Sequence, residues 1–390
     1  MRTYQVISGD GHLEVPAEMW TPRVPSQYGE LAPRLLIGAD GTTKWQMGEF
    51  VLENWGNLVA ELAYDETVPG CWQYTFPDGT PRPGTGDGAQ RLRDQDADGV
   101  DAEVLFPPVH GPKFLRRMIA KDVGAYLSFI RAFNDWLALE YCAVAPDRLI
   151  GNALLPETGV DDAIAEMKRA REMGLRGVYL GMFPNGGLAA QPEDDRFWAA
   201  SLDMETRLAP HGVMGGPYPT NELGVPDDPR YRAFTLGAEH LCMKSVVQLI
   251  VTGVLDRFPG LHFYFGETNA GWLPYSLHIL DEFYTRWYTY CDVALPRMPS
   301  EYVREHFMFN FIDDRMAVQS RYHMGIEMIA WGSDFPHSVG TYPHSREIIA
   351  DLFAGVPEPE RRRMLVTNIA DFYGLEVTGS ITPTPVPAAV

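Results

Sequence analysis

The chain has little of what marks disulfide-stabilised, secreted or membrane-spanning proteins. Its four cysteines (Cys71, Cys142, Cys242 and Cys291) are scattered and form neither a CxxC pair nor a short-chain disulfide framework, so we expect reduced thiols in a cytoplasmic protein. With 45% hydrophobic and 22% charged residues, the composition is typical of neither a disordered nor a membrane-spanning chain. Met1 runs directly into a strand-like segment without the basic region and apolar core of a signal peptide, so we expect none.

Positive charge is also scarce. The chain has 32 Lys and Arg against 52 Asp and Glu, which gives a formal net charge of −20. Such a protein repels nucleic acids and anionic membranes unless a local basic patch compensates, and the nearest candidate, Arg361 to Arg363, is most simply a solvated helix face. We therefore expect a small-molecule substrate, no nucleic-acid or membrane partner, and a homo-oligomer.

Strand-like and helix-like segments alternate along the chain at the spacing of βα units. The strand candidates are residues 4–8, 102–106, 149–155 and 177–180, a short segment ending at His211, and residues 262–267, 307–311 and 328–331. About eight strands are what a (β/α)8 barrel requires. The pattern predicts an α/β protein, a (β/α)8 TIM barrel formed by a single domain over residues 1–375, with a proline-rich tail over 376–390.

A long segment rich in Pro, Gly and Trp, residues 16–90, interrupts this alternation after the first strand. It is too long for an ordinary loop, which indicates a lid or a binding insertion. Its aromatic residues, together with two beyond it, would give the barrel mouth an apolar surface for a bulky hydrophobic or aromatic acid: Trp45, Trp55, Trp72, Phe76, Trp272 and Tyr275. Equally, they would form a small core of the insertion itself.

Metal-capable side chains follow the first and the last strand candidates. Asp10-Gly11-His12 closes one, and Gly332 to His337, which contains Asp334, closes the other. In a closed barrel the carboxyl ends of these strands converge, so the two motifs would be halves of one site. Alternation along a strand places Asp10 and His12 on the same face. The alternative is structural: Asp10 and Asp334 as helix N-caps, and His12 as a satisfied core histidine.

Six ordered motifs together carry a family resemblance. They are residues 6–14, Phe197-Trp198 followed thirteen residues on by His211, and residues 253–259, 266–272, 332–337 and 368–374. The chain resembles the amidohydrolase-related branch of the amidohydrolase superfamily, which contains metal-dependent hydrolases and nonoxidative decarboxylases on distorted TIM barrels. The resemblance implies that Asp10, His12, His211 and Asp334 bind metal and that Asp334 also takes a proton from metal-activated water. The insertion lies outside the resemblance.

Glu267 is a departure from the decarboxylases of this branch. They usually carry a histidine at the matching position, which is thought to protonate the carbon that loses CO2, whereas this chain reads Gly266-Glu267-Thr268. A carboxylate can be a ligand, a bridge between metals or a base, but it is a poor cationic proton donor. The departure favours hydrolysis of an ester, thioester, lactone or amide of a bulky hydrophobic acid, with acyl thioesters worth testing. Decarboxylation of an aromatic or enoic acid is the alternative. A second reading of Glu267 is that it only orients a ligand histidine.

The number of metal ions follows from the charge that this site would gather. Asp10, Glu267 and Asp334 place three negative charges in a small space, which one divalent ion would leave uncompensated. We therefore favour a binuclear centre over a single ion, with zinc, iron and manganese all compatible with the ligand set. Residues 177–180 lack the bridging lysine or glutamate of many binuclear relatives, so Glu267 would have to bridge.

Further candidates at the barrel mouth are His110, His337 and Trp272. His110 follows an apolar strand, and His337 lies in the Asp-Phe-Pro-His turn, so either would serve as an extra ligand or a substrate contact. A structural turn histidine is the alternative for each. A noncatalytic barrel that binds a small acid is a third class of function, and intact charged residues at the mouth argue against it.

Overall fold

The structure is a computed structural model that describes residues 3–37, 43–52, 82–108, 111–215, 241–337 and 339–377. Of the residues singled out in the sequence, Trp55, Trp72, Phe76 and His110 lie outside this described part. The same holds for most of the expected proline-rich tail.

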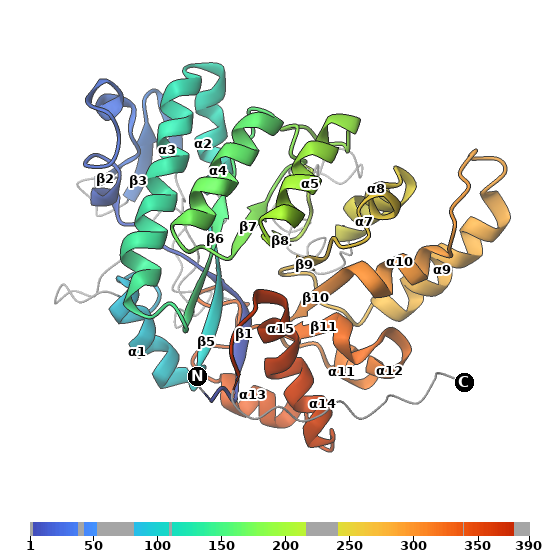
Figure 1. The fold of residues 1–390 in the computed structure, drawn as a ribbon. Coiled ribbons are helices and arrows are strands. Elements are labelled where there is room, and N and C mark those ends of the chain that lie inside the picture. The colour runs from blue at the N-terminus through green and yellow to red at the C-terminus, as the bar shows by residue number, and fades with distance from the viewer. Residues whose placement is uncertain are drawn as a thin grey trace.

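Eight parallel strands form a nearly closed barrel with helices around it (Figure 1). In order around the sheet they are β1 (Ile7–His12), β5 (Ala102–Phe106), β6 (Leu149–Leu154), β7 (Gly177–Leu180), β8 (Arg207–Pro210), β9 (Phe263–Phe265), β10 (Phe307–Phe311) and β11 (Ile329–Trp331). At the seam, the His12 amide donates to the Phe335 carbonyl at 2.7 Å and the Asp334 amide donates to the Asp10 carbonyl at 3.0 Å. The predicted TIM barrel is confirmed, and its first and last strands do converge.

The strands form where short apolar runs can be buried on both faces, as parallel sheets require. Every residue of β5, β9, β10 and β11 is buried. The first strand is the element that the sequence placed least well, because it covers Ile7–His12 rather than residues 4–8. Its last residues are polar and therefore look like a loop, but they extend the strand into the barrel mouth.

The helices surround the barrel and follow the strands in alternation (Figure 1). They are α1 (Gly88–Asp98), α2 (Gly111–Arg116), α3 (Val123–Trp136), α4 (Val160–Glu172), α5 (Asp195–Asp203), α7 (Cys242–Val251), α8 (Val254–Arg257), α9 (Leu273–Trp287), α10 (Pro299–His306), α11 (Arg315–Gln319), α12 (Arg321–Met324), α13 (Ser345–Leu352), α14 (Glu358–Arg362) and α15 (Asn368–Tyr373). Within the described ranges, none of them has the length and apolar character needed to cross a membrane.

The described parts of the insertion are ordered against the barrel. β2 (Arg34–Ile37), β3 (Thr43–Met47) and β4 (Phe50–Leu52) form a small antiparallel sheet. Trp45 in β3 is only 2% exposed and belongs to the hydrophobic core, so its role is packing rather than an open contact surface.

Residues 82–87 lead into α1, where Asp87 caps the helix by accepting a hydrogen bond from the Gln90 amide at 2.8 Å. Gly84 has a φ of 81°, and a Cβ on it would lie 2.6 Å from the Pro336 Cβ. A glycine at this position therefore lets the insertion touch the loop that carries Asp334.

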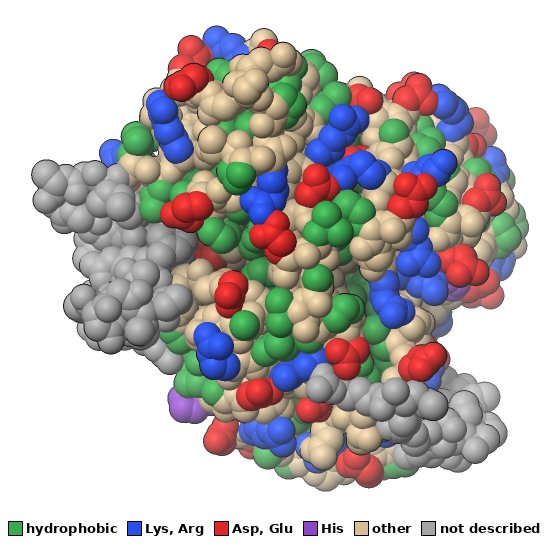
Figure 2. Space-filling view, turned by 60° about the vertical axis from the view of Figure 1, so that its left-hand side comes forward, with side chains coloured by type: hydrophobic (Ala, Val, Ile, Leu, Met, Phe, Trp, Pro, Cys, Tyr) green, Lys and Arg blue, Asp and Glu red, His purple; other side chains and the backbone are tan. Residues whose placement is uncertain are grey.

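One face of the molecule is drawn with its side chains in Figure 2. Basic and acidic side chains are interspersed over the described part of this face, with small apolar areas between them. Neither sign of charge dominates there.

Candidate metal centre at the barrel mouth

Strand β1 places Asp10 and His12 together at the carboxyl end of the barrel. Alternate residues of a strand share one face, and both side chains are buried, at 0% and 2% exposed. Ser8, two residues earlier, donates from its hydroxyl to the Asp10 carbonyl at 2.6 Å and also accepts from the Ser333 amide at 2.8 Å. The bond between Ser333 and Ser8 ties β1 to the segment that follows β11.

Three further strands end next to this pair and contribute His211, Glu267 and Asp334. His211 follows β8 directly, and its main chain forms a parallel β-bridge with Gly266, which precedes Glu267. Glu267 and Asp334 have φ angles of 48° and 54°, a left-handed conformation that costs about 1–3 kcal/mol for a residue with a Cβ. Strained residues of this kind concentrate at functional sites. Neither Asp10 nor Asp334 caps a helix, so the structural alternative for these two residues does not hold.

The side chains of these residues converge on the Nε2 atom of His12. This atom lies 3.0 Å from His211 Nε2, 3.4 Å from Asp334 Oδ1 and 3.7 Å from Asp10 Oδ1. His211 Nε2 in turn lies 3.3 Å from Asp10 Oδ1 and 3.6 Å from Glu267 Oε2. The structure therefore brings together all five residues that the sequence nominated as metal ligands.

His12 presents a lone pair to this group. Its Nδ1 lies 3.0 Å from the Pro107 carbonyl, which can only accept, so Nδ1 carries the proton and the lone pair is on Nε2. Burial, helped by the nearby His337 and His211, holds the pKa of His12 well below its ordinary value. A neutral imidazole oriented by a carbonyl is the usual form of a histidine metal ligand.

The carboxylates crowd one another. Burial first and the charge of Asp10 next raise the pKa of Asp334 well above its ordinary value. Burial and Asp334 raise the pKa of Glu267 to about 7. Burial alone would lower the pKa of His211, but pairing with Asp10 and the charges of Glu267 and Asp334 outweigh it and raise that pKa to about 9. These raised pKa values indicate that the carboxylates of the group carry more negative charge than its histidines neutralise.

A bound cation would fit the donor atoms. Asp10 Oδ1 and Asp334 Oδ2 are buried and accept no hydrogen bond from the described residues, which is costly for a carboxylate unless a cation is present. Two overlapping sets place one ligand atom per residue within 4.8 Å of one another: His12, Glu267, Asp334 and His337, and Asp10, His12 and His211. Imidazole and carboxylate together suit zinc, manganese or iron(II).

His337 lies in the same group, whereas the contacts of Trp272 are with Thr268 and Phe309. The His337 ring stacks on His12 with centroids 4.1 Å apart, and its Nδ1 is 2.7 Å from Asp334 Oδ1. Trp272, at the start of α9, donates from its indole N–H to the Thr268 carbonyl at 2.9 Å and packs edge-on against Phe309.

Sequence reasoning missed two buried charged residues next to the group, Arg91 and Glu103. Their ion pair is 2.7 Å long, and both side chains are at most 2% exposed. One signal was available, because Glu103 is a charge in the middle of an apolar strand, and such a residue needs a buried partner.

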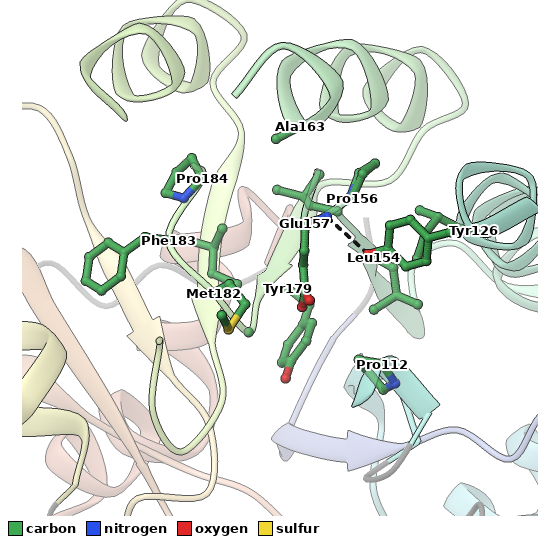
Figure 3. Close-up of a pocket in the computed structure, with 14 residues that line it drawn as sticks. Pro112, Tyr126, Leu154, Pro156, Glu157, Ala163, Tyr179, Met182, Phe183 and Pro184 are labelled. Carbon is green, nitrogen blue, oxygen red and sulfur yellow. Dashed lines mark hydrogen bonds between the residues drawn. The ribbon is translucent and has the colours of Figure 1, made fainter. Parts of the chain in front are cut away.

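An apolar hollow opens at the carboxyl ends of β6 and β7, on the same face of the barrel (Figure 3). Its cavity volume is about 20 Å³, room for about one water molecule, and its lining also includes the charged Glu157. Its wall includes Pro112, Tyr126, Leu154, Tyr179, Met182 and Phe183. The Gly215 amide, four residues after His211, donates to the Gly181 carbonyl of this wall at 3.1 Å, so the hollow adjoins the loop that carries a candidate ligand.

Solved structures similar to this chain were found, whereas no curated protein matches it significantly. An amidohydrolase from Mycobacterium avium subsp. paratuberculosis has 18% identity and a TM-score of 0.72, with 97% of this chain and 100% of that one covered. The 5-carboxyvanillate decarboxylase LigW from Sphingomonas paucimobilis has 18% identity and a TM-score of 0.66, with 96% and 100% covered. A 5-carboxyvanillate decarboxylase from Novosphingobium aromaticivorans, complexed with manganese and 4-hydroxy-3-methoxy-5-nitrobenzoic acid, has 18% identity and a TM-score of 0.63, with 95% and 96% covered. The family model described as "Amidohydrolase" matches residues 91–375, and the chain therefore belongs to the amidohydrolase family.

Proposed function

We propose that residues 1–375 form a metal-dependent nonoxidative decarboxylase of an aromatic or enoic acid. The observation that carries this proposal is the position of His337. The absence of a histidine at position 267 was the main argument against decarboxylation, yet the imidazole of His337 lies 4.1 Å from that of His12 and 2.7 Å from the Asp334 carboxylate. This imidazole supports a proton-donor role for His337, and because burial lowers its pKa, the donor would be a neutral imidazole.

The comparisons support the same choice. Two of the three similar structures described above are decarboxylases by name, and one of them holds manganese with a nitrobenzoic acid. At 18% identity these likenesses concern the fold, so the reaction and the site residues are our proposal.

A bound divalent ion would supply Lewis-acid polarisation of the substrate's oxygens, with Asp10, His12, His211 and Asp334 as its ligands. The chain's own part is to hold the acid and to move one proton. When the bond to the carboxylate breaks, its electron pair stays on the substrate carbon, CO2 leaves, and a proton held between His337 and Asp334 goes to that carbon. The step needs no oxidant or reductant.

The two ligand sets support one ion rather than the binuclear centre that charge counting favours. Both sets include His12. Its Nδ1 faces the Pro107 carbonyl, so only Nε2 is available, and one lone pair binds one metal. We propose one ion held by Asp10, His12, His211 and Asp334, with Glu267 and His337 beside it and the protonation of a carboxylate balancing the remaining charge.

Hydrolysis is the second candidate, and Glu267 favours it. Its side chain is 39% exposed, the most open of the group, and Oε2 lies 3.6 Å from His211 Nε2. Its carboxyl group nevertheless lies against buried neighbours, and this desolvation together with Asp334 raises the pKa of Glu267 to about 7, which suits a general base that takes a proton from water. In this reaction an ester, thioester, lactone or amide of a bulky acid would be the substrate.

The two reactions leave different products. We would incubate the manganese-loaded protein with 5-carboxyvanillate and 2,6-dihydroxybenzoate and measure CO2, and with esters and thioesters of hydrophobic acids in oxygen-labelled water. CO2 release with no label in an acid product is expected. Label in the product acid without CO2 would replace the proposal with the hydrolase, and a protein that binds no divalent metal would contradict both.

The pKa of His211 predicts how pH acts on the metal-free protein. Its folded value of about 9 exceeds the ordinary 6.5, so its contribution to stability is complete below about pH 6.5 and is lost as pH rises through about 9. Because a metal needs the neutral imidazole, Mn²⁺ affinity should rise over the same range. Melting temperatures and Mn²⁺ titrations between pH 6 and 9 measure both effects.

The matched variants for this test are His211→Gln and His262→Gln. The first should flatten the pH dependence of the metal-free melting temperature, while the second changes an exposed histidine bonded to the Glu305 carbonyl and should leave it as in the wild type. A metal-free protein whose melting temperature is constant from pH 6.5 to 9 would contradict the assignment of His211.

A further inference from the structure

Arg91 is a fully buried cation directly behind the metal-ligand group. It lies on α1, and its side chain is 0% exposed. Its Nε donates to Glu103 Oε2 at 2.7 Å, and the same oxygen accepts a hydrogen bond from Gln95 Nε2 at 3.1 Å. The guanidinium charge is therefore paired with the Glu103 carboxylate on β5. Its two terminal nitrogens, Nη1 and Nη2, remain available for other partners.

Those two nitrogens bind the main chain of both strand ends that carry candidate ligands. Nη1 donates to the carbonyl of His12, and Nη2 donates to the carbonyl of Phe335, each at 3.0 Å. The guanidinium also lies 4.4 Å from the centre of the Phe335 ring. Phe335 directly follows Asp334, so one rigid planar group holds β1 and the segment after β11 at a fixed separation.

This part of the barrel needs such support. β1 and the segment after β11 meet through the bridge between Gly11 and Phe335, and Asp334 keeps a φ of 54° that persists only where its surroundings impose it. Gly11 makes room for the ion pair, because a Cβ there would lie 2.2 Å from Glu103 Oε1 and 2.8 Å from Arg91 Nη2.

We infer that Arg91 is a positioning residue that, paired with Glu103, sets the separation of His12 and Asp334 and so the geometry of the metal group. The inference rests on the proposed metal-dependent function. Lysine cannot replace it fully, because a single ammonium lacks the fork that reaches two carbonyls and a carboxylate together.

The test compares Arg91→Met and Arg91→Lys with the matched control Arg148→Met. Arg148 also donates to a carbonyl, that of Asp101 at 2.9 Å, and to Asp96, but it does so just before β6, at the opposite end of the barrel. The readouts are the Mn²⁺ Kd by competition with a chelator and the visible absorption spectrum of the Co²⁺-loaded protein, with folding checked by circular dichroism.

Arg91→Met should weaken Mn²⁺ binding by about 10- to 100-fold and change the Co²⁺ spectrum, as loss of a group that orients metal ligands does. Arg91→Lys should fall between it and the wild type, and Arg148→Met should keep the wild-type Kd and spectrum. If Arg91→Met does not fold, Arg91→Lys decides alone.

Folded Arg91 variants with the wild-type Mn²⁺ Kd and Co²⁺ spectrum would overturn the inference while leaving the proposed function intact. An equal loss of affinity in Arg148→Met would also overturn it, because the effect would then be general destabilisation. A wild-type protein that binds neither ion would overturn the proposed function and this inference together.

Discussion

Asp334→Asn should abolish metal binding and turnover while leaving the fold almost unchanged. The carboxylate is fully buried at the centre of the group, 3.4 Å from His12 Nε2 and 2.7 Å from His337 Nδ1. Asparagine has the same shape but no charge, so we expect Mn²⁺ affinity to fall by at least about 100-fold and turnover by about 10²–10⁴-fold. Metal content by elemental analysis and turnover of a substrate found in the screen measure the two effects.

The fold should tolerate this change for two reasons. Asparagine is among the residues that best accept the positive φ of 54° found at this position. Burial and Asp10 also raise the pKa of Asp334, so the uncharged amide of asparagine removes a negative charge that this buried position disfavours. The metal-free melting temperature should therefore stay close to that of the wild type.

Asp314→Asn is the control for this substitution. Asp314 lies after the neighbouring strand β10, caps α11 and accepts hydrogen bonds from the Ala270 and Gly271 amides at 2.9 and 2.7 Å, outside the metal group. The Asp314→Asn substitution should lower the melting temperature and leave the metal content unchanged. If Asp334→Asn kept its metal and near wild-type turnover, the assignment of Asp334 as a ligand would be wrong.

The barrel could be predicted because each strand is a short apolar segment that can be recognised from its own residues. Segments such as Phe307–Phe311 are short and apolar, and the structure forms β10 over the same residues. The convergence of Asp10, His12, His211 and Asp334 was predictable once the barrel was, because the carboxyl ends of parallel strands share one face. Here the motif spacing and the topology are consistent with each other.

Long-range contacts account for what could not be predicted. The sequence left Trp45 open between a substrate contact and a small core of the insertion. Pairing of β3 with two other short strands buries it, and no local pattern reports that pairing. The ring stacking of His337 on His12 joins residues 325 positions apart, and the ion pair of Arg91 with Glu103 joins a helix to a strand. Such contacts depend on the assembled barrel.

Glu267→Gln should separate the two candidate reactions. The fold should survive, because the side chain is 39% exposed and the bond that fixes this residue, from its amide to Asp10 Oδ2 at 2.8 Å, belongs to the main chain. If decarboxylation is the reaction and one ion is bound, CO2 release should fall by less than about 10-fold and metal content should stay near one per chain, because a general base is not required. Hydrolysis would instead fall by about 10²–10⁴-fold, the usual contribution of such a base.

Glu282→Gln provides the matched control for Glu267→Gln, because Glu282 has a similar exposure, 44%, and pairs with Arg286 on the outside of α9. Glu267→His adds a decisive comparison, since it restores the histidine that decarboxylases of this branch usually carry. If His337 already supplies the proton, that variant should gain no more than a few-fold in CO2 release, and His337→Gln should lose about 10²-fold or more. A Glu267→Gln protein that loses half of two bound metal ions together with all activity would show that Glu267 bridges a binuclear centre, contrary to the single ion proposed here.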